Sequence, residues 1–129
     1  MKTRTYLFAL ASVGLLLLSA CGGASFKSMR SVPVEIGADE EQNIEIAREI
    51  IDDQAASVRA RLAEQFPDIS AAQIDSIEFF PETRPVQERQ VVHIQARIAY
   101  GDESFDPNAM MDACAALLRE AVAQKQGAL

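Results

Sequence analysis

The sequence predicts a small α+β domain, because apolar residues recur with a helical period in two segments and with a strand period in others. The expected order is strand, helix, strand, strand, helix. We expect the long amphipathic helix and the C-terminal helix to pack on one face of a small antiparallel sheet. The 129 residues are enough for one domain with one modest core, and the 49% of hydrophobic residues exclude wholesale disorder.

The first strand is predicted over residues 32–36, where Val32, Val34 and Ile36 alternate with Pro33 and Glu35. Pro33 has no backbone N–H, so this strand can only lie at an edge of the sheet. The preceding residues 22–31 are small, polar and without a period. We interpret residues 21–31 as a flexible tether and residues 32–129 as the folded domain.

The long helix is predicted from Asp39 to Phe66, because acidic residues stand at its start and Pro67 follows its end. Its apolar stripe, spaced by three and four, consists of Ile44, Ala47, Ile51, Ala55, Val58, Leu62 and Phe66. Ile46 and Ile50 lie off this stripe. They either pack against the strand at 32–36 or contact a partner protein, and we take them as candidate contact residues.

Two further strands are predicted over residues 74–80 and 91–100, joined as a hairpin through a solvated, charged loop at 81–90. The second strand alternates most regularly. Its buried face would carry Val92, Ile94, Ala96, Ile98 and Tyr100, and its wet face Val91, His93, Gln95, Arg97 and Ala99. The sheet should therefore be covered on one side only, as antiparallel sheets allow.

The C-terminal helix is predicted to start at Asp106 and Pro107 and to run to about Lys125. The Asp106 carboxylate would cap free amides, and Pro107 suits the first helical position. The apolar side of this helix consists of Met110, Cys114, Leu117, Leu118 and Ala121.

The first twenty residues have the parts of a secretory signal peptide: Lys2 and Arg4, then an apolar run over 7–18, then small residues. About 20 apolar residues are needed to cross a bilayer as a helix, and this run has 12. We therefore expect residues 1–20 to be cleaved off rather than retained as a membrane-spanning anchor.

The four residues Leu18, Ser19, Ala20 and Cys21 resemble the lipobox of bacterial lipoproteins at every position. The resemblance implies that the Cys21 thiol receives a diacylglyceryl group and becomes the first residue of a membrane-anchored protein. Two or more acyl chains make such an attachment stable. Gly22 in place of Asp after the cysteine favours, by the same resemblance, the outer membrane of the cell envelope, with the domain facing the periplasm. The likeness covers about 21 residues and implies nothing about the others.

Acidic residues dominate the expected mature chain. The whole sequence has a net charge of −7, and removal of Lys2 and Arg4 leaves ten basic residues against nineteen acidic ones, a net charge of −9. The basic residues form no cluster. Polyanions would be repelled, so we expect no nucleic-acid partner.

No residue pattern indicates an enzyme, a cofactor or a metal site. His93, the single histidine, has no cysteine or carboxylate at a familiar ligand spacing. Cys114 lies on an apolar helical face, which predicts a buried and inert thiol. Asp102, Glu103 and Asp106 lack the regular spacing and central glycine of a calcium loop.

We therefore expect a lipid-anchored, non-catalytic, acidic domain that contacts another protein of the cell envelope or builds part of an envelope structure. Two alternatives stay open. In one, the long helix and the sheet enclose a pocket for a lipid or small molecule. In the other, suggested by the order of elements alone, the domain is a ring-forming scaffold of an envelope assembly.

Overall fold

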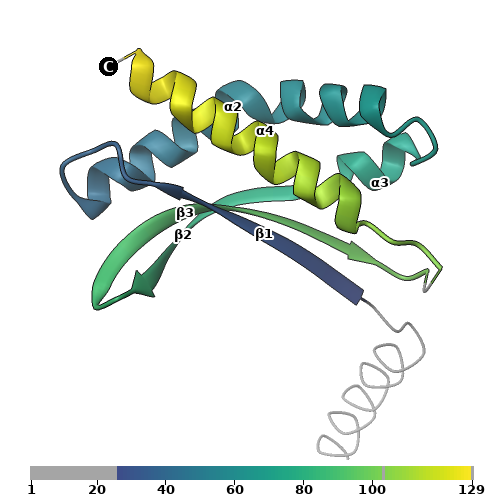
Figure 1. Ribbon diagram of the computed structural model, residues 1–129, viewed down its shortest axis with the longest axis horizontal. Helices are drawn as coiled ribbons and strands as arrows, with labels where there is room; N and C mark the ends of the chain where they lie inside the picture. Colours follow the sequence, from purple (N-terminus) through teal and green to yellow (C-terminus); the bar gives the residue numbers. More distant parts are fainter. Residues whose placement is uncertain (1–25, 103, 129) are drawn as a thin grey trace, which may run out of the picture.

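The computed structural model describes residues 26–102 and 104–128, which form three strands and three helices (Figure 1). The elements in chain order are β1 (Phe26–Val34), α2 (Glu40–Gln65), α3 (Ala71–Asp75), β2 (Glu78–Val86), β3 (Arg89–Tyr100) and α4 (Asn108–Gly127). The expected α+β class is confirmed, with α3 as an additional element. The predicted signal peptide at residues 1–20, Cys21 and residues 22–25 lie outside the described residues.

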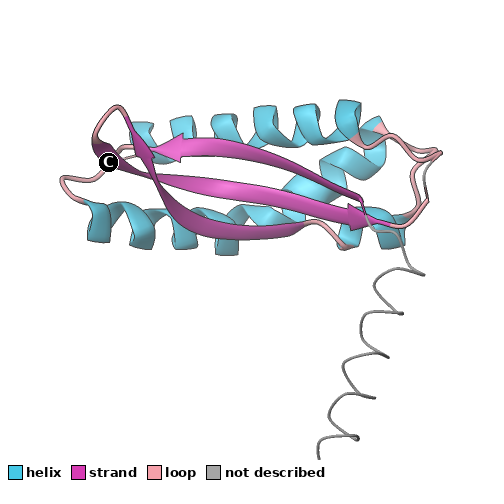
Figure 2. Ribbon diagram, turned by 90° about the horizontal axis from the view of Figure 1, so that it is seen from below, coloured by secondary structure: helices cyan, strands magenta, loops and turns pink. Residues whose placement is uncertain are grey.

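The three strands form one antiparallel sheet in the order β1-β3-β2, with β3 in the centre. Both long helices lie on the same face of this sheet, and no described element covers the other face (Figure 2). Helix α2 contacts β2 and β3, whereas α4 contacts β1, and the two helices contact each other. The structure is thus two layers with one core between them.

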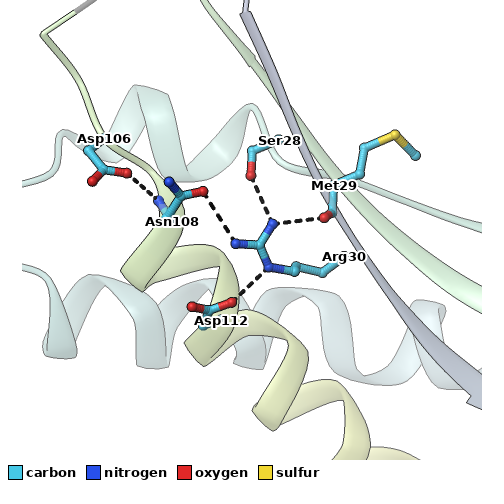
Figure 3. A network of polar contacts seen from close by, with 6 residues as sticks. All are labelled: Ser28, Met29, Arg30, Asp106, Asn108 and Asp112. Atoms are coloured by element: carbon cyan, nitrogen blue, oxygen red, sulfur yellow. Dashed lines mark hydrogen bonds and ion pairs between the residues drawn. The ribbon is translucent and has the colours of Figure 1, made fainter.

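Strand β1 begins at Phe26, so the interpretation of residues 26–31 as tether is wrong. These residues pair with β3 from Phe26 opposite Tyr100 to Ser31 opposite Gln95. Arg30 also fastens the strand to α4: its Nε donates to Asp112 Oδ1 at 2.8 Å and its Nη2 to Asn108 Oδ1 at 3.3 Å (Figure 3). The apolar alternation that predicts a strand is missing here, because the helix-facing positions of β1 include Ser28 and Arg30 rather than apolar residues.

Helix α2 confirms the predicted segment almost to the residue, and its Asp39 N-cap accepts a hydrogen bond from the Gln42 amide at 2.9 Å. Ala47, Val58 and Leu62 of the predicted stripe are buried. Ile50 is also buried, at 2% exposure, because α4 covers this side of α2. The stripe is therefore wider than predicted in the N-terminal half of the helix.

The predicted strand at 74–80 is wrong in its first half, because Ile74 and Asp75 belong to the short helix α3. Ser70 caps this helix by accepting from the Gln73 amide, while the Gln73 side chain reaches back to Ser70, which is a capping box. Ser and Gln three residues apart were the signal for this helix. Strand β2 starts only at Glu78.

The predicted loop at 81–90 is also wrong, because β2 continues to Val86 and β3 begins at Arg89. The turn consists of Gln87 and Glu88, whose φ angles of 48° and 68° are both positive, as a two-residue hairpin turn of this hand requires. The hairpin itself is confirmed. Neither Asn nor Gly marks the turn, and the prolines of β2 suggested a loop although an edge strand tolerates them.

Helix α4 begins at Asn108, one residue after the predicted first helical position at Pro107, and it packs the expected apolar face into the core. Asp106 Oδ1 accepts from the Asn108 amide at 2.9 Å, so this carboxylate does serve the helix start. Its fully covered residues include Met110, Met111, Cys114 and Leu118. Together with Val32, Ile94 and Ile98 of the sheet and Leu62 of α2, they form one continuous core.

Candidate functional site

The candidate site is the uncovered face of the sheet, which we call the open face. Cross-strand partners share a face, and Val32, paired with Ile94, is buried under the helices. The open face therefore consists of the odd-numbered residues of β1 and β3 and the even-numbered residues of β2. Its members are Lys27, Met29, Ser31, Pro33, Glu78, Phe80, Glu82, Arg84, Val86, Arg89, Val91, His93, Gln95, Arg97 and Ala99.

Polar side chains form a connected line across the middle of the open face. Arg84 Nη1 of β2 donates to Ser31 Oγ of β1 at 3.2 Å, and that hydroxyl donates to Gln95 Oε1 of β3 at 2.6 Å. Gln95 is only 1% exposed, and its Nε2 has no hydrogen-bond partner among the described residues. A buried amide donor without a partner is costly, so this face holds an unused hydrogen-bonding group.

Basic residues outnumber acidic ones on the open face. It carries Lys27, Arg84, Arg89 and Arg97 against Glu78 and Glu82, a net charge of +2, whereas α2 alone carries seven acidic and three basic residues. The charged residues of this acidic chain are thus divided unevenly between its two layers, with the excess of basic residues on the sheet.

The basic side chains are held in different ways. Arg97 Nη2 lies 3.0 Å from Glu78 Oε2, and its guanidinium lies 5.1 Å from the centre of the Phe80 ring. Arg89 pairs with Glu35 at 3.2 Å. Lys27 and Arg84 have no carboxylate within ion-pair distance in the described part of the chain. Of the four basic residues on the open face, these two are therefore available to pair with a carboxylate of a partner.

Apolar contact area is present at two ends of the open face. Met29 is 43% exposed and Val86 is 39% exposed, and these are the exposed large hydrophobic side chains of the described residues. They come from different strands, and both point away from the helices. Methionine, arginine and aromatic residues, all found here, are enriched at protein interfaces.

Prolines restrict the edges of the sheet. Pro33 lies in β1, one edge strand, and Pro81 and Pro85 lie in β2, the other. A proline cannot donate a backbone hydrogen bond, so it interrupts the row that an added strand would need. The broad open face is therefore better suited to a partner than strand addition along β2 is.

The structure separates the residues predicted as functional. Ile50 is buried and is not an exposed partner contact, which corrects that prediction, and Ile46 is half-buried against the core. Ile50 lies beside Ala121 and Lys125 of α4, with which it lines a shallow hollow. Cys21 lies outside the described residues.

The residues considered for catalysis or metal binding are not grouped into a site in the described part of the chain. His93 lies on the open face, where its Nδ1 is 3.1 Å from the Val91 carbonyl oxygen. Cys114 is fully buried under the helices, and this burial raises the pKa of its thiol to about 12. Within residues 26–102 and 104–128, no three His, Cys, Asp or Glu side chains are grouped to hold a metal ion.

A groove of about 390 Å³ lies between α2 and α3, lined by Ala56, Ala60, Ala63, Ala71, Arg59, Ile74 and Asp75. The Arg59 side chain is already used structurally, because its Nη2 donates to the Ile77 carbonyl oxygen at 2.6 Å and its guanidinium lies 4.9 Å from the Phe79 ring centre. The groove is on the surface. The ligand-binding alternative expected a pocket between the long helix and the sheet, where the core residues are packed together.

Sequence reasoning placed the right residues of β3 on the open face, although Val91 and Gln95 are buried there rather than wet, and it missed the rest of that face. Met29 and Arg84 were assigned to a tether and a loop, so their place beside Gln95 could not be seen. The alternation of Glu82, Arg84 and Val86 with Pro81, Thr83 and Pro85 was the available signal for β2.

Comparison with protein-family models, curated proteins and solved structures found no match. None of the helices in the described part of the chain is both long and apolar enough to cross a bilayer.

Proposed function

We propose that this chain is a bacterial lipoprotein, anchored through Cys21, whose non-catalytic domain binds an acidic surface of another cell-envelope protein with its open face. The anchor is supported by the signal-peptide pattern and the lipobox resemblance at residues 18–21. The observation that carries the binding role is the open face itself, with a net charge of +2 on a chain of −7. An acidic partner is favoured by charge complementarity.

The size of the face limits the area that a complex can bury. Three strands about 4.8 Å apart and about 30 Å long present roughly 400 Å². Stable complexes bury about 800 Å² per partner, so this face alone supports a weak complex. Anchoring both proteins to one membrane would raise their effective concentration and compensate for weak contacts.

The anchor is tested by the N-terminal mass of the protein extracted from membranes, beside a Cys21→Ala variant. We expect a mass that begins at Cys21 with its lipid, and loss of membrane attachment in the variant. An unmodified N-terminus cut elsewhere would contradict the anchor.

The binding role is tested by placing a photo-activated crosslinking residue at Met29 in living cells and, as a matched position, at Glu45 on the exposed side of α2. We expect one defined protein adduct from Met29 and none from Glu45. The double reversal Lys27→Glu with Arg84→Glu should abolish that adduct.

A second double reversal, Arg48→Glu with Arg119→Glu, makes the same change in net charge on the helical layer. This control should leave the adduct intact. Equal loss with both pairs of reversals would show that net charge, and not the open face, governs the contact, and the binding proposal would be wrong.

A further inference from the structure

The start of β1 limits how far the domain can stand from its anchor. Only four residues lie between Cys21 and Phe26. Five Cα–Cα steps span at most about 18 Å. This reach is short beside the roughly 30 Å length of a nine-residue strand. If Cys21 carries the lipid, as the proposed function holds, the Phe26 end of the sheet is the end next to the bilayer.

That same end of the sheet carries an aromatic cluster. Phe26 and Tyr100 pair across β1 and β3, and their ring centres lie 5.5 Å apart in a stacked arrangement. Phe105, in the loop before α4, meets Tyr100 edge to face at 5.3 Å. All three side chains remain partly exposed. Figure 1 shows the beginning of β1 and the end of β3 at the same end of the molecule.

Half-buried aromatic rings suit the interfacial region of a bilayer, where one side of the ring is apolar and the other is wet. The charges at this end indicate which lipids fit. Asp102 and Asp106 are exposed, and hydrogen bonds from the Ser104 hydroxyl and amide lower the pKa of Asp102. Exposed Lys27 also lies at this end, beside Phe26, but the two carboxylates outnumber it. Ionised carboxylates are repelled by anionic headgroups, so the neutral surface of a zwitterionic bilayer is the better match.

We propose that Phe26, Tyr100 and Phe105 form a lipid-contact end, which rests in the interface of a zwitterionic bilayer and makes the sheet rise away from the membrane. This inference depends on the proposed attachment through Cys21. Its consequence is that the open face stands to the side of the membrane surface and is accessible to a neighbouring envelope protein. The hairpin at Gln87 and Glu88 becomes the distal end of the domain.

The chain provides its own probe for this arrangement, because it has no tryptophan and Tyr100 is the single tyrosine after residue 20. The native protein, extracted from membranes, is placed in phosphatidylcholine and phosphatidylethanolamine vesicles that contain nitroxide-labelled lipids. We expect quenching of Tyr100 fluorescence by at least a third with a label at the headgroup, and weaker quenching with a label deep in the acyl chains.

The matched variant carries Tyr100→Phe with Val86→Tyr, which moves the fluorophore to the hairpin end, about 35 Å along the sheet. We expect no quenching there. Equal quenching at both positions, or none at Tyr100 in protein whose N-terminal mass shows the lipid, would overturn the lipid-contact end and leave the anchor standing. A mass without lipid would overturn the proposed function, and this inference with it.

Discussion

The two faces of the same sheet differ in composition and burial, and β3 shows the contrast within one strand. Its even-numbered residues Val92, Ile94, Ala96 and Ile98 are at most 1% exposed beneath the helices. Its odd-numbered residues include His93, Arg97 and the amide of Gln95, whose Nε2 has no partner. The covered face supplies stability through apolar burial, whereas the open face holds a buried amide donor without a partner among the described residues, which lowers stability.

The largest expected effect comes from truncating one residue of each face. Ile94→Ala leaves a cavity in the core and should lower the free energy of unfolding by about 2–5 kcal/mol. Met29→Ala, on the open face, should change it by less than about 0.5 kcal/mol. Urea unfolding followed by circular dichroism measures both. Similar losses for the two variants would mean that the open face also belongs to the stabilising core.

Titration of Cys114, behind the covered face, should produce the next largest effect. The pKa of its thiol is raised from 9.0 to about 12 by burial, so the folded protein keeps the proton where the unfolded chain loses it. Its contribution to stability is complete below about pH 9 and is lost as the pH rises toward 12. In a Cys21→Ala background, this decline in the free energy of unfolding should be smaller in Cys114→Ala.

The same thiol distinguishes the two faces kinetically. At pH 8, Cys114 should react with a disulfide reagent only as fast as the protein unfolds, because it is buried and protonated. A thiol introduced on the open face by Met29→Cys, in a chain without the other cysteines, should react at once. Fast labelling of native Cys114 would show that the covered face opens readily.

The smallest effect concerns the amide of the open face, and its sign is the informative part. Gln95→Leu removes a buried amide whose Nε2 has no acceptor among the described residues, so stability should stay equal or rise by up to about 1 kcal/mol. Ser31→Ala instead removes the donor to Gln95 Oε1 and should cost about 1–3 kcal/mol. A clear loss of stability in Gln95→Leu would mean that the bond from the Ser31 hydroxyl to Gln95 Oε1 outweighs the cost of the unpartnered Nε2.

Regular periodicity made most of the fold predictable from the sequence. The spacing of Ala47, Val58 and Leu62 located α2, and the alternation through β3 located the central strand and its covered face. Where long-range pairing overrides local pattern, the predictions were wrong. A charged residue at a helix-facing position, as at Arg30, and prolines, as at Pro81 and Pro85, are typical of loops. Here they lie in strands because β1 and β2 both pair with β3.

The sequence by itself determined the α+β class, the edge position of the strand with Pro33, the one-sided cover of the sheet and the burial of Cys114, because these follow from local period and composition. Only the tertiary structure decided that residues 26–31 belong to the sheet, that Ile50 is covered by α4, and that Arg84, Ser31 and Gln95 form one line. These three arrangements join segments more than fifty residues apart, and such contacts are set by packing between elements, which no local pattern encodes.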